Sequence, residues 1–251
     1  MLPVPKTRSS RTALIRAPFW LSVAAIWLLA SPAMAEKSLT PHSAEYKVKI
    51  SVLRGRLRTE LRATDSGYEA THEIVATGIS RLFAKGSIRE TSHFAIAADG
   101  LLPTRYLSSD TLTRDKSRAD LHFNWATGEV TGTVNDEAVQ TILDNIVLDR
   151  VSLQYELMRD LLNGGPSEQY ILFDIDKLKT LNVRIVGTKR IKVPAGSFDA
   201  IGIQHQAENS SRVTTLWCVE ELGFLPVLIE QHRKGKLRVR ASLRKYEPAT
   251  T

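Results

Sequence analysis

The chain has 251 residues, of which 34 are Lys or Arg and 27 are Asp or Glu, for a formal net charge of +7. Four of these cations precede residue 17, so the rest of the chain has a surplus of only about +3, which does not indicate a nucleic-acid partner. Its single cysteine, Cys218, excludes an intramolecular disulfide. The apolar and β-branched neighbours of Cys218 predict a buried side chain instead of a reactive thiol.

The first 35 residues have the pattern of a secretory signal peptide. Four cations and no acidic residue precede or border an apolar run at 17–30, which is shorter than the roughly 20 residues that a membrane span needs. The small residues Ala33 and Ala35 suit a peptidase site, so we expect cleavage after Ala35 and a mature chain of 36–251. This predicts a periplasmic protein without a transmembrane anchor after cleavage. An uncleaved N-terminal anchor is the alternative.

Period-two alternation dominates from residue 42 onward and predicts successive antiparallel strands separated by turns rich in Gly, Asp and Asn. Strands of roughly ten residues are long for a globular sheet, and long strands twist and curl. We therefore expect a single mainly β domain at 36–251, built as a strongly curved antiparallel sheet or open half-barrel of β-spiral type. The predicted strands lie at about 44–52, 53–62, 68–77, 86–97, 102–111, 117–125, 129–134, 169–175, 181–193, 198–207, 211–219, 225–232 and 237–246.

One segment breaks this period and predicts an amphipathic helix, because apolar residues recur there at three- and four-residue steps. Asp149 can cap its start, and Asn163-Gly164-Gly165 followed by Pro166 ends it. We expect the helix to cover the concave side of the curved sheet, whose apolar face must be buried. The residues that share the apolar side are Leu148, Val151, Tyr155, Met158 and Leu162.

Several short motifs occur in a characteristic order along the chain. The first half has Tyr46, Gly67-Tyr68, Gly78 and Leu102-Pro103. The second half has Leu148-Asp149-Arg150-Val151-Ser152-Leu153, Val193-Pro194-Ala195-Gly196-Ser197-Phe198-Asp199-Ala200, Thr215-Leu216-Trp217 and Leu225-Pro226-Val227. In this order, over residues 40–247, the chain resembles DUF3108, a family of exported bacterial proteins of unknown function. The resemblance implies a periplasmic β-rich domain and supplies no catalytic residues.

Arginines gather on one side of two predicted strands, at 53–62 and 237–246. If these strands lie near each other, the arginines form one basic face, which attracts anionic lipid head groups, lipopolysaccharide phosphates or acidic polymers. The alternative is that they are the solvated faces of edge strands, where charge discourages aggregation. The candidate residues for the anionic ligand are Arg54, Arg56, Arg58, Arg62, Arg238, Arg240 and Arg244.

Two tryptophans of the mature chain have two interpretations. Trp125 lies beside a turn and Trp217 in the middle of a strand, so both suit the core of a sheet. A curved sheet with an incompletely filled concave side would instead present them as the lining of an apolar pocket.

Motifs for chemistry are missing from the sequence. No two histidines have the spacing of metal ligands, and no G-x-S-x-G string occurs. We therefore predict no catalytic residue, no metal and no cofactor, and a non-enzymatic envelope protein that binds a lipid, a glycan or an envelope protein and supports envelope integrity. One alternative is a structural partner of a membrane complex. The other is a hydrolase of envelope polymer with a dispersed site, for which the candidate carboxylates are Asp144, Asp149, Asp174 and Asp176.

Overall fold

The computed structural model describes residues 37–249, so the predicted leader at 1–35 and its cleavage site lie outside the described residues. Fourteen antiparallel strands form one sheet in these residues. The strands are β1 (His42–Ile50), β2 (Leu53–Thr64), β3 (Gly67–Ala76), β4 (Ser87–Ala97), β5 (Gly100–Asp110), β6 (Ser117–Asn124), β7 (Glu129–Val134), β8 (Glu137–Ile142), β9 (Gln169–Asp174), β10 (Lys177–Val193), β11 (Gly196–Ala207), β12 (Arg212–Val219), β13 (Leu225–Arg233) and β14 (Lys236–Pro248). The helical elements are α1 (Ser152–Leu162), η1 (Gly78–Leu82) and η2 (Glu220–Leu222).

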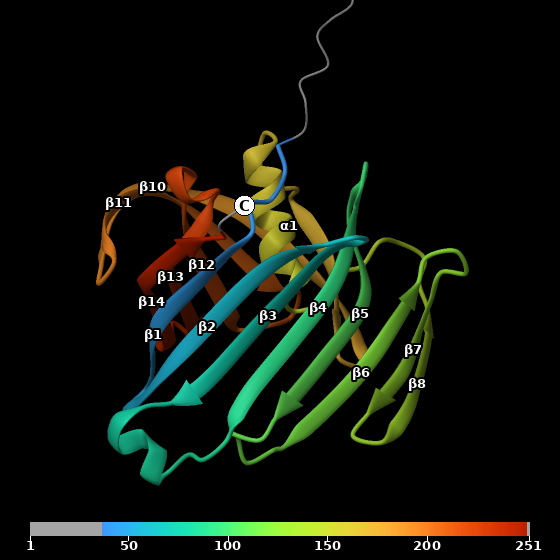
Figure 1. Cartoon of the computed structure of the whole chain (residues 1–251), viewed down its shortest axis with the longest axis horizontal. Helices are drawn as coiled ribbons and strands as arrows, with labels where there is room; N and C mark the ends of the chain where they lie inside the picture. Colours follow the sequence, from blue (N-terminus) through green and yellow to red (C-terminus); the bar gives the residue numbers. More distant parts are fainter. Residues whose placement is uncertain (1–36, 250–251) are drawn as a thin grey trace, which may run out of the picture. The chain divides into compact units, whose positions relative to one another are not determined.

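The sheet is two meanders joined at one long-range pairing, between β1 and β14. The strand order is β8-β7-β6-β5-β4-β3-β2-β1-β14-β13-β12-β11-β10-β9, so β8 and β9 are the two edges. The sheet curls strongly without joining these edges in its ladder (Figure 1). The expected mainly β fold, an open and curved antiparallel sheet with one helix, is confirmed.

Strand β8 was missed by the sequence prediction. It pairs with β7 from Glu137 to Ile142, and its side chains are exposed or only half-buried. An edge strand with little contact to the core has a weak alternation of polar and apolar residues, which explains the omission. The preceding Asn135 and Asp136 both have positive φ, as a two-residue hairpin turn requires. This Asn-Asp dipeptide is the feature of the sequence that could have indicated the hairpin and therefore β8.

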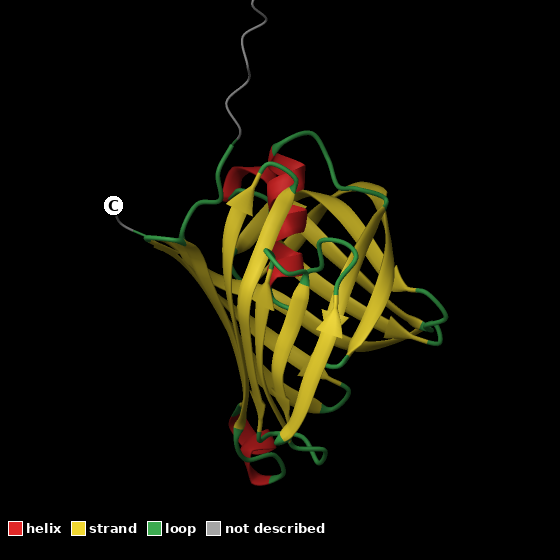
Figure 2. Cartoon of the chain, turned by 90° about the vertical axis from the view of Figure 1, so that its right-hand side faces the viewer, coloured by secondary structure: helices red, strands yellow, loops and turns green. Residues whose placement is uncertain are grey.

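Helix α1 lies on the concave side of the sheet, near the opposite end from η1 (Figures 1 and 2). Its start is tied to strand β4 by one carboxylate. Asp149 accepts hydrogen bonds from the backbone N–H groups of Val151 and Ser152, both at 2.8 Å, and from the Ser92 hydroxyl at 2.5 Å. The predicted cap at Asp149 is therefore confirmed, and it also fixes the helix to the sheet.

The helix also reaches strand β5. Glu156 accepts a hydrogen bond from the Leu101 backbone N–H at 2.9 Å and pairs with Arg159 at 3.1 Å. The apolar side of α1 is buried in the core, where Tyr155 is fully covered and Leu157 is only 1% exposed. No helix among residues 37–249 has the length and apolar character to span a membrane.

Alternation along β1 separates the core from the outer surface. Ala44, Tyr46 and Val48 are buried against the core, and the residues between them face outward. Residues directly opposite in an antiparallel ladder project to the same side of the sheet. The outward side chains of β2, β1 and β14 therefore form continuous rows, and these rows carry the candidate site. Cys218 is buried at 1% exposure, as expected, and burial raises the pKa of its thiol.

Candidate functional site

The two arginine-bearing strands lie on either side of β1, so their outward residues meet on one surface. In the ladder, Lys49 of β1 stands opposite Arg54 of β2 and Arg240 of β14. One step along, Lys47 stands opposite Arg56. The condition set by the sequence, that the strands lie near each other, is met. The structure adds the two lysines of β1, which sequence reasoning overlooked although they alternate with buried residues.

Four of the seven predicted arginines are held by carboxylates, and we call them the paired arginines. Glu45 lies 2.9 Å from Arg244 and 3.9 Å from Arg58. Arg62 pairs with Glu60 at 2.7 Å, and this hydrogen bond raises the pKa of its guanidinium. Arg240 pairs with Glu230 at 3.5 Å. The paired arginines are Arg58, Arg62, Arg240 and Arg244.

The other cations of this surface form no ion pair. Within residues 37–249, no carboxylate oxygen lies within the 4.0 Å ion-pair distance of these side chains. Four of them are exposed, and Arg56 is half-buried. We call this set the free cations, which are Lys47, Lys49, Arg54, Arg56 and Arg238.

The arrangement of the free cations is unfavourable for the sheet itself. Like charges directly opposite on neighbouring strands destabilise an antiparallel pair by a few tenths of a kcal/mol to about 1 kcal/mol. The ladder contains two such contacts side by side, Lys47 with Arg56 and Lys49 with Arg54. An anion placed over these rows removes the repulsion and accepts charge-assisted hydrogen bonds, so the geometry favours an anionic ligand.

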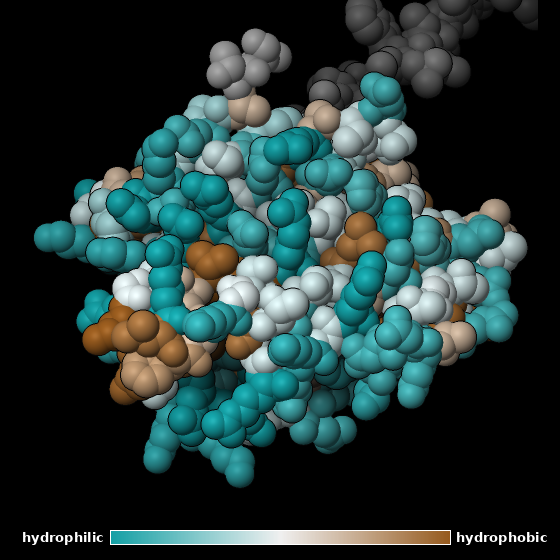
Figure 3. All heavy atoms as spheres, turned by 60° about the horizontal axis from the view of Figure 1, so that its bottom comes forward, coloured by the Kyte–Doolittle hydropathy of each residue, from teal (hydrophilic) through white to brown (hydrophobic). Residues whose placement is uncertain are grey.

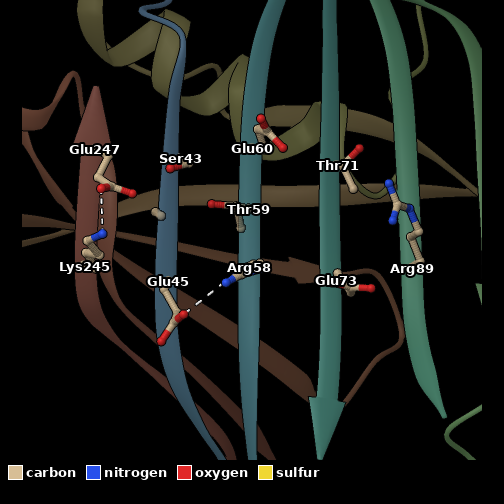
Figure 4. A pocket seen from close by; sticks show the side chains of 11 residues that line it. Ser43, Glu45, Arg58, Thr59, Glu60, Thr71, Glu73, Arg89, Lys245 and Glu247 are labelled. Atoms are coloured by element: carbon tan, nitrogen blue, oxygen red, sulfur yellow. Dashed lines mark ion pairs between the residues drawn. The ribbon is translucent and has the colours of Figure 1, made fainter. Parts of the chain in front are cut away.

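A shallow pocket of about 420 Å³ lies on the outer surface of β14, β1, β2, β3 and β4, next to the free cations. Figure 4 shows side chains from five successive strands around it. Arg58, Arg89 and Lys245 supply positive charge to this pocket. Its acidic residues are Glu45, Glu60, Glu73 and Glu247.

The charges of this pocket largely compensate one another. Lys245 pairs with Glu247 at 2.6 Å, and this contact lowers the pKa of the Glu247 carboxyl. Arg58 faces Glu45 in the same way (Figure 4). The pocket is thus suited to hydroxyl groups or a zwitterion, whereas the uncompensated positive field lies over the free cations.

The two tryptophans lie apart from this pocket. Trp125 donates a hydrogen bond from Nε1 to the Pro103 carbonyl at 2.6 Å and stacks on Phe123 with ring centroids 6.2 Å apart. Trp217 is 8% exposed, and the Lys189 ammonium lies 3.9 Å from its ring centroid. Both rings are packed against protein groups, and their role as a pocket lining stays a prediction.

The candidate carboxylates of the alternative hydrolase have structural partners where they are buried. Asp149 caps α1, and its burial raises its pKa to about 6. Asp174 is bonded to both Arg150 and Lys179, and its pKa is lowered despite its burial. Asp176 pairs with Lys177 at 3.9 Å, and Asp144 is exposed. Among residues 37–249, no group of three or more His, Cys, Asp or Glu side chains is arranged to hold a metal ion.

Comparison with known families gives the same family that the order of the sequence motifs indicated. The profile of DUF3108, described as a protein of unknown function, matches residues 43–239. The chain belongs to the DUF3108 family. The match begins in β1 and ends within β14, so the DUF3108 region contains all five free cations.

One solved structure similar to this DUF3108 protein is the crystal structure of a beta-barrel-like protein of domain of unknown function DUF1849 from Brucella abortus. The TM-score is 0.58 at 14% sequence identity, over 86% of this chain and 100% of that chain. At this identity the likeness concerns the fold alone. No curated protein matches the chain.

Proposed function

We propose that this DUF3108 protein is a non-enzymatic periplasmic protein that binds an anionic lipid or glycan of the cell envelope and supports envelope integrity. The observation that carries the proposal is the set of free cations, of which Lys47 and Lys49 of β1 stand opposite Arg56 and Arg54 of β2. Arg238 on β14 belongs to the same surface, and within residues 37–249 none of the five has a carboxylate partner at ion-pair distance. Arginine and lysine in such a surface attract phosphate and carboxylate groups, and arginine can bind them through two parallel hydrogen bonds.

The location rests on the leader pattern at residues 1–35, with its cations, its short apolar run and its small residues before Glu36. The direct check is cell fractionation of a host that expresses the full chain, followed by sequencing of the N-terminus. A mature form that begins at Glu36 in the periplasmic fraction is the expected result. Recovery of the uncleaved chain in the cytoplasm contradicts the proposed location.

Binding is tested with heparin as a soluble acidic glycan and with anionic lipid, across a range of salt concentrations. The triple variant Arg54→Gln, Arg56→Gln, Arg238→Gln removes free cations, and the matched control Arg58→Gln, Arg62→Gln, Arg244→Gln removes paired arginines. Each triple variant changes the net charge equally. We expect the first variant to lose most binding and much of its salt dependence, and the control to retain both. No binding to either probe, or equal loss in both variants, contradicts the proposal.

A further inference from the structure

Three segments of the chain converge at the end of the sheet that lies opposite α1. The turn between β1 and β2 contacts β14, because Ser51 donates its backbone N–H to the Arg238 carbonyl at 3.3 Å. η1 is fastened to the start of β2 on the other side. There the Arg54 backbone N–H donates to the Ser80 hydroxyl at 2.9 Å, and Thr77 donates to the Arg54 carbonyl at 2.9 Å.

These three segments carry only positive charge, and we call them together the basic end. Residues 47–56 contain four Lys or Arg residues, residues 77–89 contain three and residues 233–240 contain five. None of the three segments contains Asp or Glu. A concentration of one sign of charge at one end of a domain orients it toward a surface of the opposite sign.

Large apolar side chains are exposed at the same end. Val52 in the turn between β1 and β2 is 85% exposed. Ile79, Leu82 and Phe83, in and directly after η1, are 76%, 73% and 79% exposed. Figure 3 turns this end toward the viewer and shows a hydrophobic patch, at the lower left, bordered by hydrophilic side chains. A cluster of this kind on a water-soluble surface marks a site of contact with an apolar partner.

A second pocket, of about 370 Å³, is lined by the free cation Arg56 and by residues that flank Leu82 and Phe83 in the chain. Arg56, Arg81 and Lys85 line it together with small or backbone groups, and no carboxylate is among its lining residues. Arg81 donates from Nε to the Ala76 carbonyl at 3.3 Å, which holds its guanidinium at the pocket. Three cations around a small pocket without an acid provide a site for a phosphate group.

The proposed function leaves the anionic partner open between lipid and glycan, and the basic end distinguishes them. Resting on that proposed function, we propose that the basic end docks on an anionic phospholipid bilayer. A lipid phosphate occupies the pocket of Arg56, Arg81 and Lys85, and Leu82 and Phe83 enter the interface between head groups and acyl chains. An acidic glycan accounts for the cations, but it offers no apolar phase for the exposed side chains.

The test uses the mature protein, residues 36–251, obtained by expressing the full chain. Its association is measured with vesicles of phosphatidylglycerol and phosphatidylcholine, and with vesicles of phosphatidylcholine alone. Leu82→Ser with Phe83→Ser removes the apolar contact at exposed positions. Ile142→Ser, on a side chain that is 63% exposed on β8, is the matched control. We expect the double variant to weaken association with anionic vesicles at least about tenfold, and the control to change it less than about twofold.

The pocket is tested by Arg81→Gln with Lys85→Gln, and the control is Arg190→Gln, which removes an exposed arginine paired with Asp199 at 3.1 Å. We expect the pocket variant to lose the preference for anionic vesicles and the control to keep it. Insertion of residue 83 into the bilayer is measured by the tryptophan fluorescence of the variant Phe83→Trp. On vesicle binding, this emission should shift to the blue and be quenched by brominated acyl chains. Unchanged emission with full vesicle binding overturns the docking.

Binding to heparin distinguishes a failure of the membrane docking from a failure of the proposed function. If the protein binds heparin through the free cations but does not bind anionic vesicles, the membrane docking is wrong and the proposed function stands. If it binds neither probe, both are wrong. Equal binding to anionic and uncharged vesicles also overturns the inference, because the basic end then has no role.

Discussion

Lys49 of β1 lies directly opposite Arg54 of β2, with both side chains on the outer surface of the sheet. Four residues along each strand, the ladder instead pairs opposite charges, since Glu45 is opposite Arg58. One pair of strands thus has compensated charges toward one end and uncompensated cations toward the other. Packing does not require this pattern, because neither Lys49 nor Arg54 is buried. The charge pattern is that of a surface that binds an anion.

The repulsion predicts a stabilising substitution. Lys49→Gln should raise the free energy of unfolding by a few tenths of a kcal/mol to about 1 kcal/mol at low salt, because it removes contacts with Arg54 and Arg240. The gain should shrink in high salt, where the charges are screened. Arg58→Gln, which removes a partner of Glu45, should give no gain. Denaturant unfolding at two salt concentrations is the measurement, and a gain independent of salt contradicts the charge explanation.

The link between helix and sheet predicts a large loss at Asp149. Asp149→Ala leaves the N–H groups of Val151 and Ser152 and the Ser92 hydroxyl without their acceptor in the buried interior. We expect a loss of about 2 kcal/mol in the free energy of unfolding. Asp144→Ala, at an exposed position nearby in the chain, should change it by less than about 0.5 kcal/mol. Similar values for the two variants argue against Asp149 as the anchor of α1.

Burial of His72 predicts a dependence of stability on pH. Its Nε2 is fully buried, and burial lowers the pKa of the imidazole to about 4, although Glu90 opposes this shift. The unfolded chain binds a proton near pH 6.5, whereas the folded chain does not until about pH 4. The contribution of His72 to stability is therefore present above pH 6.5 and falls as the pH drops toward 4, by up to about 3 kcal/mol.

The variant His72→Gln isolates this contribution, because glutamine does not titrate. The difference in unfolding free energy between wild type and variant should decrease steadily from pH 7 to pH 4. Asp149 acts with the opposite sign, because its raised pKa of about 6 lowers stability as the pH rises from about 4 to 6. Since both proteins retain Asp149, its effect cancels in the difference. A difference that stays constant with pH shows that His72 is not held neutral by the fold.

Gly202 predicts a steric effect at Trp217. A Cβ atom at this position would lie 2.7 Å from Cγ2 of Val186 and 2.8 Å from Cζ3 of Trp217. Gly202→Ala should lower the free energy of unfolding by about 1–3 kcal/mol through overpacking. Adding Val186→Ala should restore part of this loss, because it removes one of the two contacts. If Gly202→Ala unfolds like the wild type, Trp217 is less tightly packed than described.

Much of the fold could be predicted from local patterns. Period-two alternation gave most strands, and the three- and four-residue steps around Tyr155 gave the helix. The pairing of β1 with β14 could not be derived, because it joins residues about 200 positions apart and depends on how both meanders curl. The basic face could therefore be stated only as a condition, and this pairing is what brings Arg54 and Arg240 to either side of Lys49.

The sequence was least informative about exposed apolar residues. Ile79, Leu82 and Phe83 lie between the predicted strands at 68–77 and 86–97, where the sequence predicted no element. Residues of these types are usually buried, so composition does not reveal that they are exposed. Their exposure follows from η1, which projects them away from the sheet at a turn that Ser80 fastens to β2. Which arginines are paired also depends on register, because Glu45 and Glu230 meet their partners across strands.

The most direct measurement of the central claim, that the basic end meets the anionic partner, is lysine labelling of the wild-type protein with an amine-reactive reagent. Labelling is compared with and without phosphatidylglycerol vesicles. Lys49 and Lys85 belong to the basic end, whereas Lys192 and Lys245 lie outside it on β10 and β14. The account predicts protection of Lys49 and Lys85 with Lys192 and Lys245 unchanged. Protection of Lys192 and Lys245 alone, or no protection at any of the four, would contradict it.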